Sequence, residues 1–369
     1  MKVAVTGSSG LIGTALVASL RADGHEVIRL VRRPPRAAGE VRWDPRAADA
    51  GLLSPGMSVS SGTRAPSGGR GSPGTRGASG TRGSSGMPGL SALDGLGACV
   101  HLAGAGVADH RWTARYKAEI RASRILGTRV LAGALAKLGQ PPATLVAASA
   151  IGWYGDTGGR EVDESAPAGP AFLSRLVQDW EAAASPAADT GIRVVHLRSG
   201  LVLTPRGGFL ARLLPLARYG LCPRFSSGRQ VMSWISLSDE IGAIRFLLGR
   251  EDLSGAFNLT APAPVTNAEF TAALNTAALN TGAPGTAGRR DGSWRRVLTS
   301  LLRVPAPVLR LAVGEAAVEL LTSARVSSRR LQEAGYQFRY PALPGALAAE
   351  LARVSDDHGV LKSARLPAR

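Results

Sequence analysis

The stretch VTGSSGLIG, residues 5–13, decides the fold. It places Gly7, Gly10 and Gly13 in a G-x-x-G-x-x-G spacing, directly after the short apolar run KVAVT and at the start of a helical pattern. Glycines so spaced between a strand and a helix are typical of a dinucleotide-binding turn. Gly7 permits the tight turn, Gly10 lets the backbone approach a pyrophosphate, and Gly13 lets the helix pack on the strand.

The same turn predicts which groups face the phosphates. A helix begins at Leu11, so the free amide groups near Leu11 and Ile12 lie at its positive end, where anions bind. Ser9 lies within the loop between the first two glycines and is included in the predicted site. We therefore predict nucleotide binding at this turn.

Further strands and helices alternate along the chain. Apolar strand patterns occur at 25–31, 97–104, 144–149 and 191–198, and helical patterns at 11–24, 113–139 and 171–181. Strands separated by helices imply a parallel sheet covered on both faces. The expected fold class is α/β: a Rossmann-type doubly wound parallel sheet with a smaller substrate lobe and a C-terminal helical domain.

Composition limits the class of protein. The chain has 369 residues, only two cysteines and a formal net charge of +17. The cysteine count suits a reducing cytosol, and no signal peptide or bilayer-length apolar run is visible, so we expect a cytoplasmic protein without membrane or metal sites. The arginines are scattered and lack aromatic interleaving, which argues against nucleic acid. A small-molecule ligand and a possible homodimer remain as partners.

Polar inserts divide the chain. Arginine recurs every six residues from Arg64 to Arg82 in a glycine- and serine-rich run with few apolar residues, which predicts a disordered insert at about 55–89. The expected organisation is a Rossmann domain at 1–200, carrying that insert. It is followed by substrate-lobe segments at 201–275, a polar insert at 276–300, a small C-terminal domain at 301–352 and a tail at 353–369.

The end of the second strand bears on cofactor choice. NAD-binding folds keep an acidic residue there for the ribose 2′-hydroxyl, whereas this chain has LVRRP, with Arg32 and Arg33. Guanidinium groups suit a 2′-phosphate, so the sequence favours NADP(H) over NAD(H), unless one or both arginines are simply solvated.

Several further motifs resemble those of the extended short-chain dehydrogenase/reductases. The chain is most similar to an atypical branch of that group, the epimerase family proteins of NAD-dependent epimerase/dehydratase type, whose members end in a small domain of unknown function. The motifs that carry the resemblance are WDP (43–45), HLAGAGVADHRW (101–112), SRILGT (123–128), SAIGWYG (149–155), DWE (179–181), SGRQVMSWI (227–235) and FNLTAPAPVTNAEF (257–270). The resemblance implies an NADP(H)-binding Rossmann fold in which Leu102, Ala103, Gly104 and Ser149 also contact the cofactor.

The resemblance also implies catalytic residues that this chain lacks. Counting from Gly155 places Ala150, with Ser149 beside it, at the family's Ser/Thr position. Counting from Glu181 places Leu173 and Val177 at the Tyr and Lys positions, and residues 160–190 contain no tyrosine or lysine. A tyrosine needs a nearby cation to act as an acid or base near neutrality, so the usual proton relay is missing.

Few residues in the sequence could replace the missing catalytic groups. Tyr154, Lys117 and Ser149 are the candidate catalytic residues, although Tyr154 also suits a structural turn and Lys117 an exposed helix face. Trp112 and Trp153 suit either stacking or core packing. Asp163 and Glu164 fall in a polar loop where we expect them to be solvated, and His101 and His110 form no metal pair with a nearby carboxylate.

Two functions stay open. The first is an NADP(H)-dependent oxidoreductase or epimerase with rearranged catalytic groups and an unknown substrate. The second is a non-catalytic NADP(H)-binding protein that senses a ligand or partner. A retained cofactor site and an open cleft favour the first.

Overall fold

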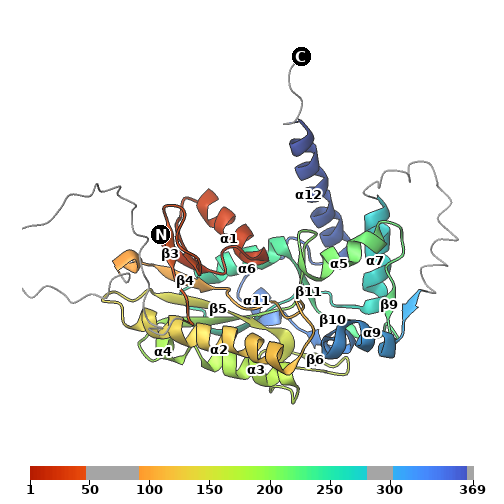
Figure 1. Cartoon of the computed structure of the whole chain (residues 1–369), viewed down its shortest axis with the longest axis horizontal. Helices are drawn as coiled ribbons and strands as arrows, with labels where there is room; N and C mark the ends of the chain where they lie inside the picture. Colours follow the sequence, from red (N-terminus) through yellow and green to blue (C-terminus); the bar gives the residue numbers. More distant parts are fainter. Residues whose placement is uncertain (47–90, 281–301, 364–369) are drawn as a thin grey trace, which may run out of the picture.

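A seven-stranded parallel sheet forms the centre of the molecule (Figure 1). The computed structural model describes residues 1–46, 91–280 and 302–363. The strand order is β3-β2-β1-β4-β5-β7-β12, so the order reverses between β1 and β4, where dinucleotides bind in Rossmann folds. The strands are β1 (Lys2–Thr6), β2 (Glu26–Val31), β3 (Glu40–Arg42), β4 (Ala98–His101), β5 (Thr144–Ala150), β7 (Arg193–Ser199) and β12 (Gly255–Leu259).

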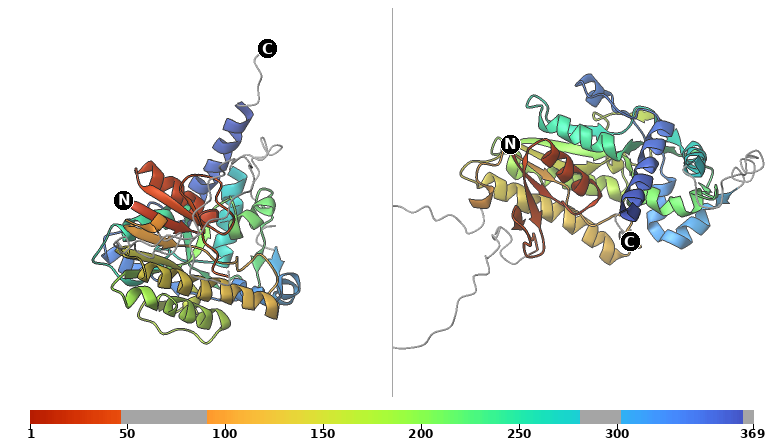
Figure 2. Two further views of the ribbon diagram at one scale, coloured as in Figure 1. Left: turned by 60° about the vertical axis from the view of Figure 1, so that its left-hand side comes forward. Right: turned by 90° about the horizontal axis from the view of Figure 1, so that it is seen from above.

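Helices cover both faces of this sheet (Figures 1 and 2). One face carries α1 (Leu11–Ala22) and α6 (Leu237–Leu248), and the other carries α2 (Ala114–Ala136), α3 (Phe172–Ala182) and α4 (Ser185–Ala188). The strands bury apolar side chains on both sides, with Val3 and Val5 in one core and Ala4 in the other. This two-sided burial explains why the strands are continuous apolar runs. The predicted fold class is confirmed.

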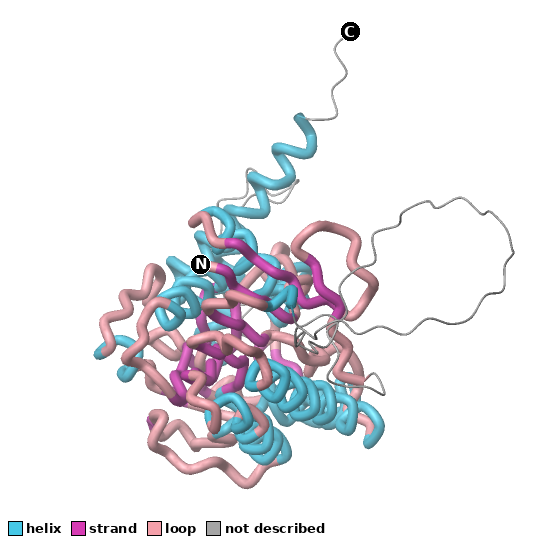
Figure 3. Tube along the Cα trace, turned by 90° about the vertical axis from the view of Figure 1, so that its left-hand side faces the viewer, coloured by secondary structure: helices cyan, strands magenta, loops and turns pink. Residues whose placement is uncertain are grey.

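In a view along the long axis of the molecule, the strands again lie between helices (Figure 3). Most of the remaining elements form a second lobe beside the sheet (Figure 1). Its strands pair in twos: β8 (Leu201–Leu203) with β11 (Trp234–Ser236), β9 (Arg224–Phe225) with β14 (Arg303–Val304), β10 (Val231–Met232) with β13 (Val265–Thr266), and β6 (Glu161–Val162) with β15 (Arg325–Val326). Its helices are α5 (Gly208–Ala217), α7 (Asn267–Asn280), α9 (Ala306–Val313), α10 (Ala317–Leu321) and α12 (Leu343–Ser363). Helix α11 (Arg329–Glu333) instead packs on β12 of the central sheet, and its Leu331 lies in the sheet core. Three short 3-10 turns complete the described elements: η1 (Ser91–Leu93), η2 (Ile151–Trp153) and η3 (Gly314–Ala316).

Within the second lobe, residues 201–275 and the C-terminal segment share one core. Leu210 and Phe270 from the lobe pack in the same buried cluster as Leu309, Ala317 and Leu347 from the C-terminal segment. The pairing of β15 with β6 adds a backbone link to the sheet-bearing part of the chain. The C-terminal segment is thus integrated into the molecule rather than appended to it.

The C-terminal helices differ in detail from the sequence expectation. The run VLRLAVGEAAVELL at 308–321 has the pattern of one amphipathic helix. It is divided, because Gly314 has a φ of +69°, a conformation that ends α9 and that side-chain-bearing residues rarely adopt. Helix α12 continues to Ser363, past residue 352 where the tail was expected to begin. The arginine-repeat run at 62–89 lies outside the described residues.

Candidate functional site

The glycine turn has the geometry that its spacing predicts. Gly7 has a φ of +63°, and a Cβ atom there would lie 2.7 Å from the Leu102 carbonyl carbon. A Cβ on Gly13 would collide with the Gly7 carbonyl oxygen, and the Gly10 amide donates to that same oxygen over 2.9 Å. Only glycine at 7 and 13 therefore lets β1, α1 and the loop after β4 meet this closely.

A cavity of about 700 Å³ opens beside this turn, at the carboxyl ends of β1, β2 and β4. Several predicted cofactor residues line it: Gly7, Ser9, Gly10, Arg32, Arg33, Leu102, Ala103 and Gly104. Leu11, Ile12, Gly13 and Ser149 are not among its lining residues. Arg29 and Tyr116, which sequence analysis did not single out, line it as well, and so does Trp43 of the WDP motif, which was not assigned to the cofactor site.

A cluster of charged side chains, Arg29, Arg33 and Glu40, lies at the β2 end of this cavity. Glu40 is buried, and its carboxylate accepts two hydrogen bonds of 2.8 Å from Arg33 and one from the Arg36 amide. Arg29 lies 3.1 Å from the same carboxylate. The hydrogen bonds from Arg33, followed by the Arg36 amide, lower the pKa of Glu40 to about 2. Arg33 is therefore held by a carboxylate that sequence analysis missed.

Arg32 has a different environment. It is exposed, lines the cavity and makes no hydrogen bond or ion pair with any residue that the structure describes. Arg29 donates to the Ser8 hydroxyl over 3.3 Å, which links the cluster to the glycine turn. Sequence analysis could have identified Arg29, because it is a charged residue within the apolar strand EVIRLV. A charged residue in such a strand is seldom buried without a partner.

The loop after β4 is fixed by Thr6. The Thr6 hydroxyl oxygen accepts hydrogen bonds from the amides of Leu102 and Ala103, so its own proton goes to His101 Nδ1, 2.7 Å away. Burial lowers the pKa of His101 to about 4, so the ring stays neutral and can accept at Nδ1. This arrangement holds the second wall of the cavity against the end of β1.

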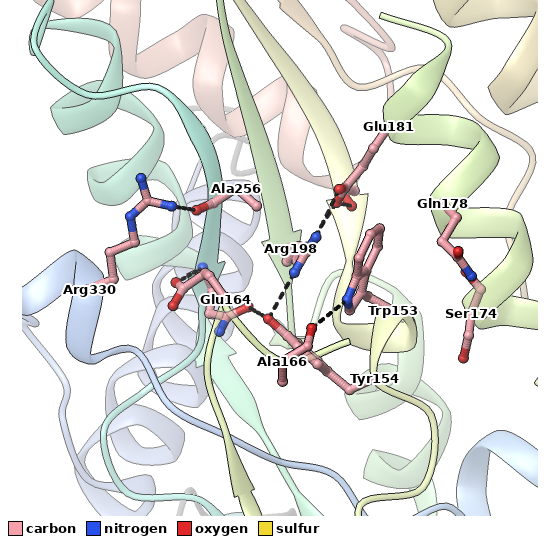
Figure 4. A network of polar contacts seen from close by, with 12 residues as sticks. Trp153, Tyr154, Glu164, Ala166, Ser174, Gln178, Glu181, Arg198, Ala256 and Arg330 are labelled. Carbon is pink, nitrogen blue, oxygen red and sulfur yellow. Dashed lines mark hydrogen bonds and ion pairs between the residues drawn. The ribbon is translucent and has the colours of Figure 1, made fainter. Parts of the chain in front are cut away.

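A polar network follows the end of β5 (Figure 4). The Ser149 hydroxyl donates to Glu181 on α3 over 2.6 Å, and Glu181 accepts two hydrogen bonds of 2.9 Å from Arg198 on β7. Burial disfavours the Glu181 carboxylate, but the hydrogen bonds from Arg198 and Ser149 outweigh it and lower the pKa. Ser149 is thus already engaged on the α3 face of the sheet.

Tyr154 belongs to the same network. Its hydroxyl donates to Asn258 Oδ1 over 2.7 Å and accepts from Arg198 over 3.1 Å. The side chain is buried, and burial raises its pKa to about 12. The Arg198 guanidinium also lies 3.8 Å from the centroid of the Trp153 ring. These contacts match the structural interpretation of Tyr154 that the turn position allowed.

Glu164 corrects one expectation. It is half-buried rather than solvated, because its carboxylate accepts a 2.7 Å hydrogen bond from the Asn258 amide on β12. Burial raises the pKa of Glu164. The neighbouring Asp163 is bonded to Ser165.

The positions where relatives would carry Tyr and Lys form an apolar wall. Leu173 and Val177 lie on α3, and a Cβ atom on Gly152 of η2 would touch both, at 3.4 and 3.8 Å. Leu173 also borders a buried cluster with Trp112 and Leu176. At these two positions α3 therefore offers no proton-transfer group; its Ser174 hydroxyl donates to the Gly152 carbonyl oxygen, and its Glu181 carboxylate is bonded to Ser149 and Arg198.

Lys117 does not fill this gap in the structure. Its ammonium group forms an ion pair with Glu315 of η3 and lies 5.5 Å from the centroid of the Phe172 ring. Within the described ranges, no group of three His, Cys, Asp or Glu side chains could hold a metal ion. None of the described helices is long and apolar enough to cross a bilayer.

Comparison with known proteins agrees with the fold and the glycine turn. The family described as NAD dependent epimerase/dehydratase matches residues 3–60 and 80–260. This chain belongs to the NAD-dependent epimerase/dehydratase family. A domain of unknown function, DUF1731, matches residues 304–350, so this member of the family combines the two parts.

Individual relatives extend over most of this epimerase-family chain. The epimerase family protein Mb2239 of Mycobacterium bovis is 41% identical over 346 residues, which are 94% of this chain and 96% of the relative. The crystal structure of human epimerase family protein SDR39U1 with NADPH has a TM-score of 0.74 and 31% identity, covering 95% of this chain and 99% of that one. A nucleoside-diphosphate sugar epimerase of Corynebacterium glutamicum has a TM-score of 0.67 and 29% identity, covering all of this chain and 62% of that one.

Proposed function

We propose that this protein binds NADP(H) in the 700 Å³ cavity and acts as an oxidoreductase or epimerase on a small molecule. The observation that carries the proposal is Arg32, an exposed arginine without a partner among the described residues, at the end of β2 where the ribose of the adenosine binds in Rossmann folds. The human relative, crystallised with NADPH, supports the same choice.

The residues present fit such a cofactor. Gly7 and Gly10 expose backbone to the cavity, the N-terminus of α1 attracts the pyrophosphate, and Arg32 offers a guanidinium to a 2′-phosphate. Glu40 is occupied by Arg29, Arg33 and a backbone amide, so it is not available to accept from a 2′-hydroxyl in the way that NAD-specific folds require. Bound NADP(H) would supply hydride transfer at the carboxyl ends of the strands.

The nature of the substrate is a further part of the proposal. The Corynebacterium relative is named for nucleoside-diphosphate sugars, which makes nucleotide sugars the first compounds to test. We expect their turnover to be slow or undetectable, because Leu173 and Val177 replace a relay whose proton donor typically contributes about 10²–10⁴-fold. We further propose a cytoplasmic location, and a division of roles in which residues 1–200 hold the cofactor while the second lobe, which shares one core with the C-terminal segment, holds the substrate.

The apolar surface formed by Leu173 and Val177 also favours a second candidate function. With Leu173 and Val177 beside η2, the chain could bind NADP(H) and recognise a ligand without chemistry. A test of hydride transfer separates the two. The protein is incubated with NADPH carrying deuterium at nicotinamide C4 and a panel of aldehydes and ketones, and separately with NADP⁺ and a panel of nucleotide sugars; products are identified by mass spectrometry and, for epimers, by chromatography. Deuterium in a carbonyl-derived product, or oxidation or epimerisation of a nucleotide sugar, supports the enzyme, whereas tight cofactor binding without any of these changes supports the binding protein.

A further inference from the structure

The C-terminal segment packs beside α3 and the turn after β5, where Leu173 and Val177 replace the Tyr and Lys expected from the family. On one side, Ala316 packs against the cluster of Trp112 and Leu176, which Leu173 also borders. On the other side, Ala324 packs with Tyr154, just after η2. These contacts bring residues 316–324 beside both α3 and the turn after β5.

Two backbone contacts fix this packing. The Thr157 amide donates to the Ser323 carbonyl oxygen over 2.7 Å, and Arg325 and Val326 pair with β6. At the other end, Arg111 from the loop after β4 donates to the Leu311 carbonyl oxygen, beside the ion pair between Lys117 and Glu315. The segment is therefore anchored to the loops that follow both β4 and β5, the strands over which the nicotinamide half of a dinucleotide extends from the switch point.

Glu319 lies between these anchors. Ala316 has helical backbone angles and leads directly into α10, so Glu319 follows one turn later on the same helix face. Its side chain is half-buried and makes no hydrogen bond or ion pair with any residue in the described ranges. A carboxyl group without a partner in an apolar setting is unusual, because burying an unpaired charge is costly.

We propose that Glu319 is the proton-transfer group that replaces the missing Tyr and Lys pair, a proposal that rests on the NADP(H) function above. Bound NADPH would supply the hydride for the substrate's carbonyl carbon, and the Glu319 carboxyl group would donate the proton to the substrate oxygen, so that an alcohol, NADP⁺ and a carboxylate result. In the reverse direction, the carboxylate would accept the hydroxyl proton as the hydride passes to NADP⁺. The carboxylate regains its proton from water.

The electrostatics of the site agree with this role. Burial raises the pKa of Glu319 to about 7, with no charged neighbour contributing, and a general acid works best when its pKa is near the working pH. Burial is the cause of this shift, and no charged group on the elements packed against η3 and α10 contributes to it. These groups are Arg310 on α9, Glu315 on η3, Arg115, Lys117, Glu119, Arg121, Arg124 and Arg129 on α2, and Arg175, Asp179 and Glu181 on α3.

A binding experiment tests the proposal without a known substrate. The nicotinamide ring is positively charged in NADP⁺ and neutral in NADPH, so a nearby carboxylate favours the oxidised form only when it is deprotonated. Affinities for NADP⁺ and NADPH are measured by calorimetry between pH 6 and pH 8 on the full chain, on Glu319→Gln, and on Glu315→Gln as the matched control. The titration of the 2′-phosphate, with a pKa near 6, is common to both cofactors and cancels in the ratio.

The expected result is a preference for NADP⁺ over NADPH that rises by about tenfold from pH 6 to pH 8 in the unmodified chain and in Glu315→Gln, but stays flat in Glu319→Gln. A flat ratio in the unmodified chain, or a rise that survives in Glu319→Gln, would overturn the role of Glu319. If neither cofactor bound, the proposed function itself would fail, and this proposal with it. Carboxyl-carbon NMR of the unmodified protein gives an independent reading: the pKa of Glu319 should be about one unit lower with NADP⁺ than with NADPH.

Discussion

The buried pair of Arg198 and Glu181 gives the strongest test of the network after β5. The side chain of Arg198 is 4% exposed and that of Glu181 is 11% exposed, and two hydrogen bonds of 2.9 Å join them. Replacing Arg198 by methionine leaves the Glu181 carboxylate buried, with the Ser149 hydroxyl as its remaining hydrogen-bond donor among those described. Removing one partner of such a pair costs about 3–5 kcal/mol, so we expect a loss of that size in the free energy of unfolding at pH 7.

A second substitution distinguishes two contributions to the free energy of unfolding: the cost of leaving a buried charge unpaired, and the net stabilisation by the Arg198–Glu181 pair. Glu181→Met in the Arg198→Met background removes the stranded carboxylate, so the double variant should recover to within about 1–2 kcal/mol of the unmodified chain. The assay is urea unfolding followed by far-ultraviolet circular dichroism. A single-variant loss below about 1 kcal/mol, or a double variant less stable than Arg198→Met alone, would refute the view that Arg198 chiefly neutralises Glu181.

Three further predictions concern the cofactor cavity. Arg32→Ala should weaken NADPH binding about tenfold and leave NADH binding unchanged, whereas Arg36→Ala, an exposed arginine that does not line the cavity, should change neither in calorimetry. Gly13→Ala should reduce NADPH affinity at least tenfold because its Cβ collides with the loop, while Gly133→Ala, with open space around it, should not. Glu40→Gln should lose about 1–2 kcal/mol of stability at pH 7, after allowance for solvent screening. Arginine hydrogen bonds lower the Glu40 pKa from 4.5 to about 2, so the loss should begin to shrink below about pH 4.5 and nearly vanish towards pH 2 in thermal unfolding; an equal loss at pH 7 and at about pH 2.5 would contradict it.

The local sequence pattern was sufficient to predict the sheet and the glycine turn. Strands buried on both faces must be continuously apolar, and the turn needs glycine where Gly7 and Gly13 stand, so both features are visible in the sequence. The alternation of side chains along β5 could also have predicted the direction of Ser149: Leu145 and Ala147 face the core under α2 and α4, and Ser149 follows them on that side, towards Glu181.

Features that depend on long-range packing were not predictable in this way. Glu40 comes to Arg29 and Arg33 only because β3 pairs with β2. Glu164 is half-buried because its loop packs on β12, over 90 positions away in the chain. The unpartnered environment of Glu319 likewise depends on the C-terminal segment crossing the turn after β5. The spacing of apolar residues along the sequence does not predict which of these distant residues come together.

The central claim is that the cavity beside the glycine turn selects NADP(H), and one measurement tests it most directly. Calorimetric titration of the unmodified full chain with NADPH and with NADH, at one pH and one salt concentration, compares the two cofactors. The account predicts that NADPH binds at least about tenfold more tightly, a difference of about 1.4 kcal/mol. Equal affinities for NADPH and NADH, or no binding of NADPH, would contradict it.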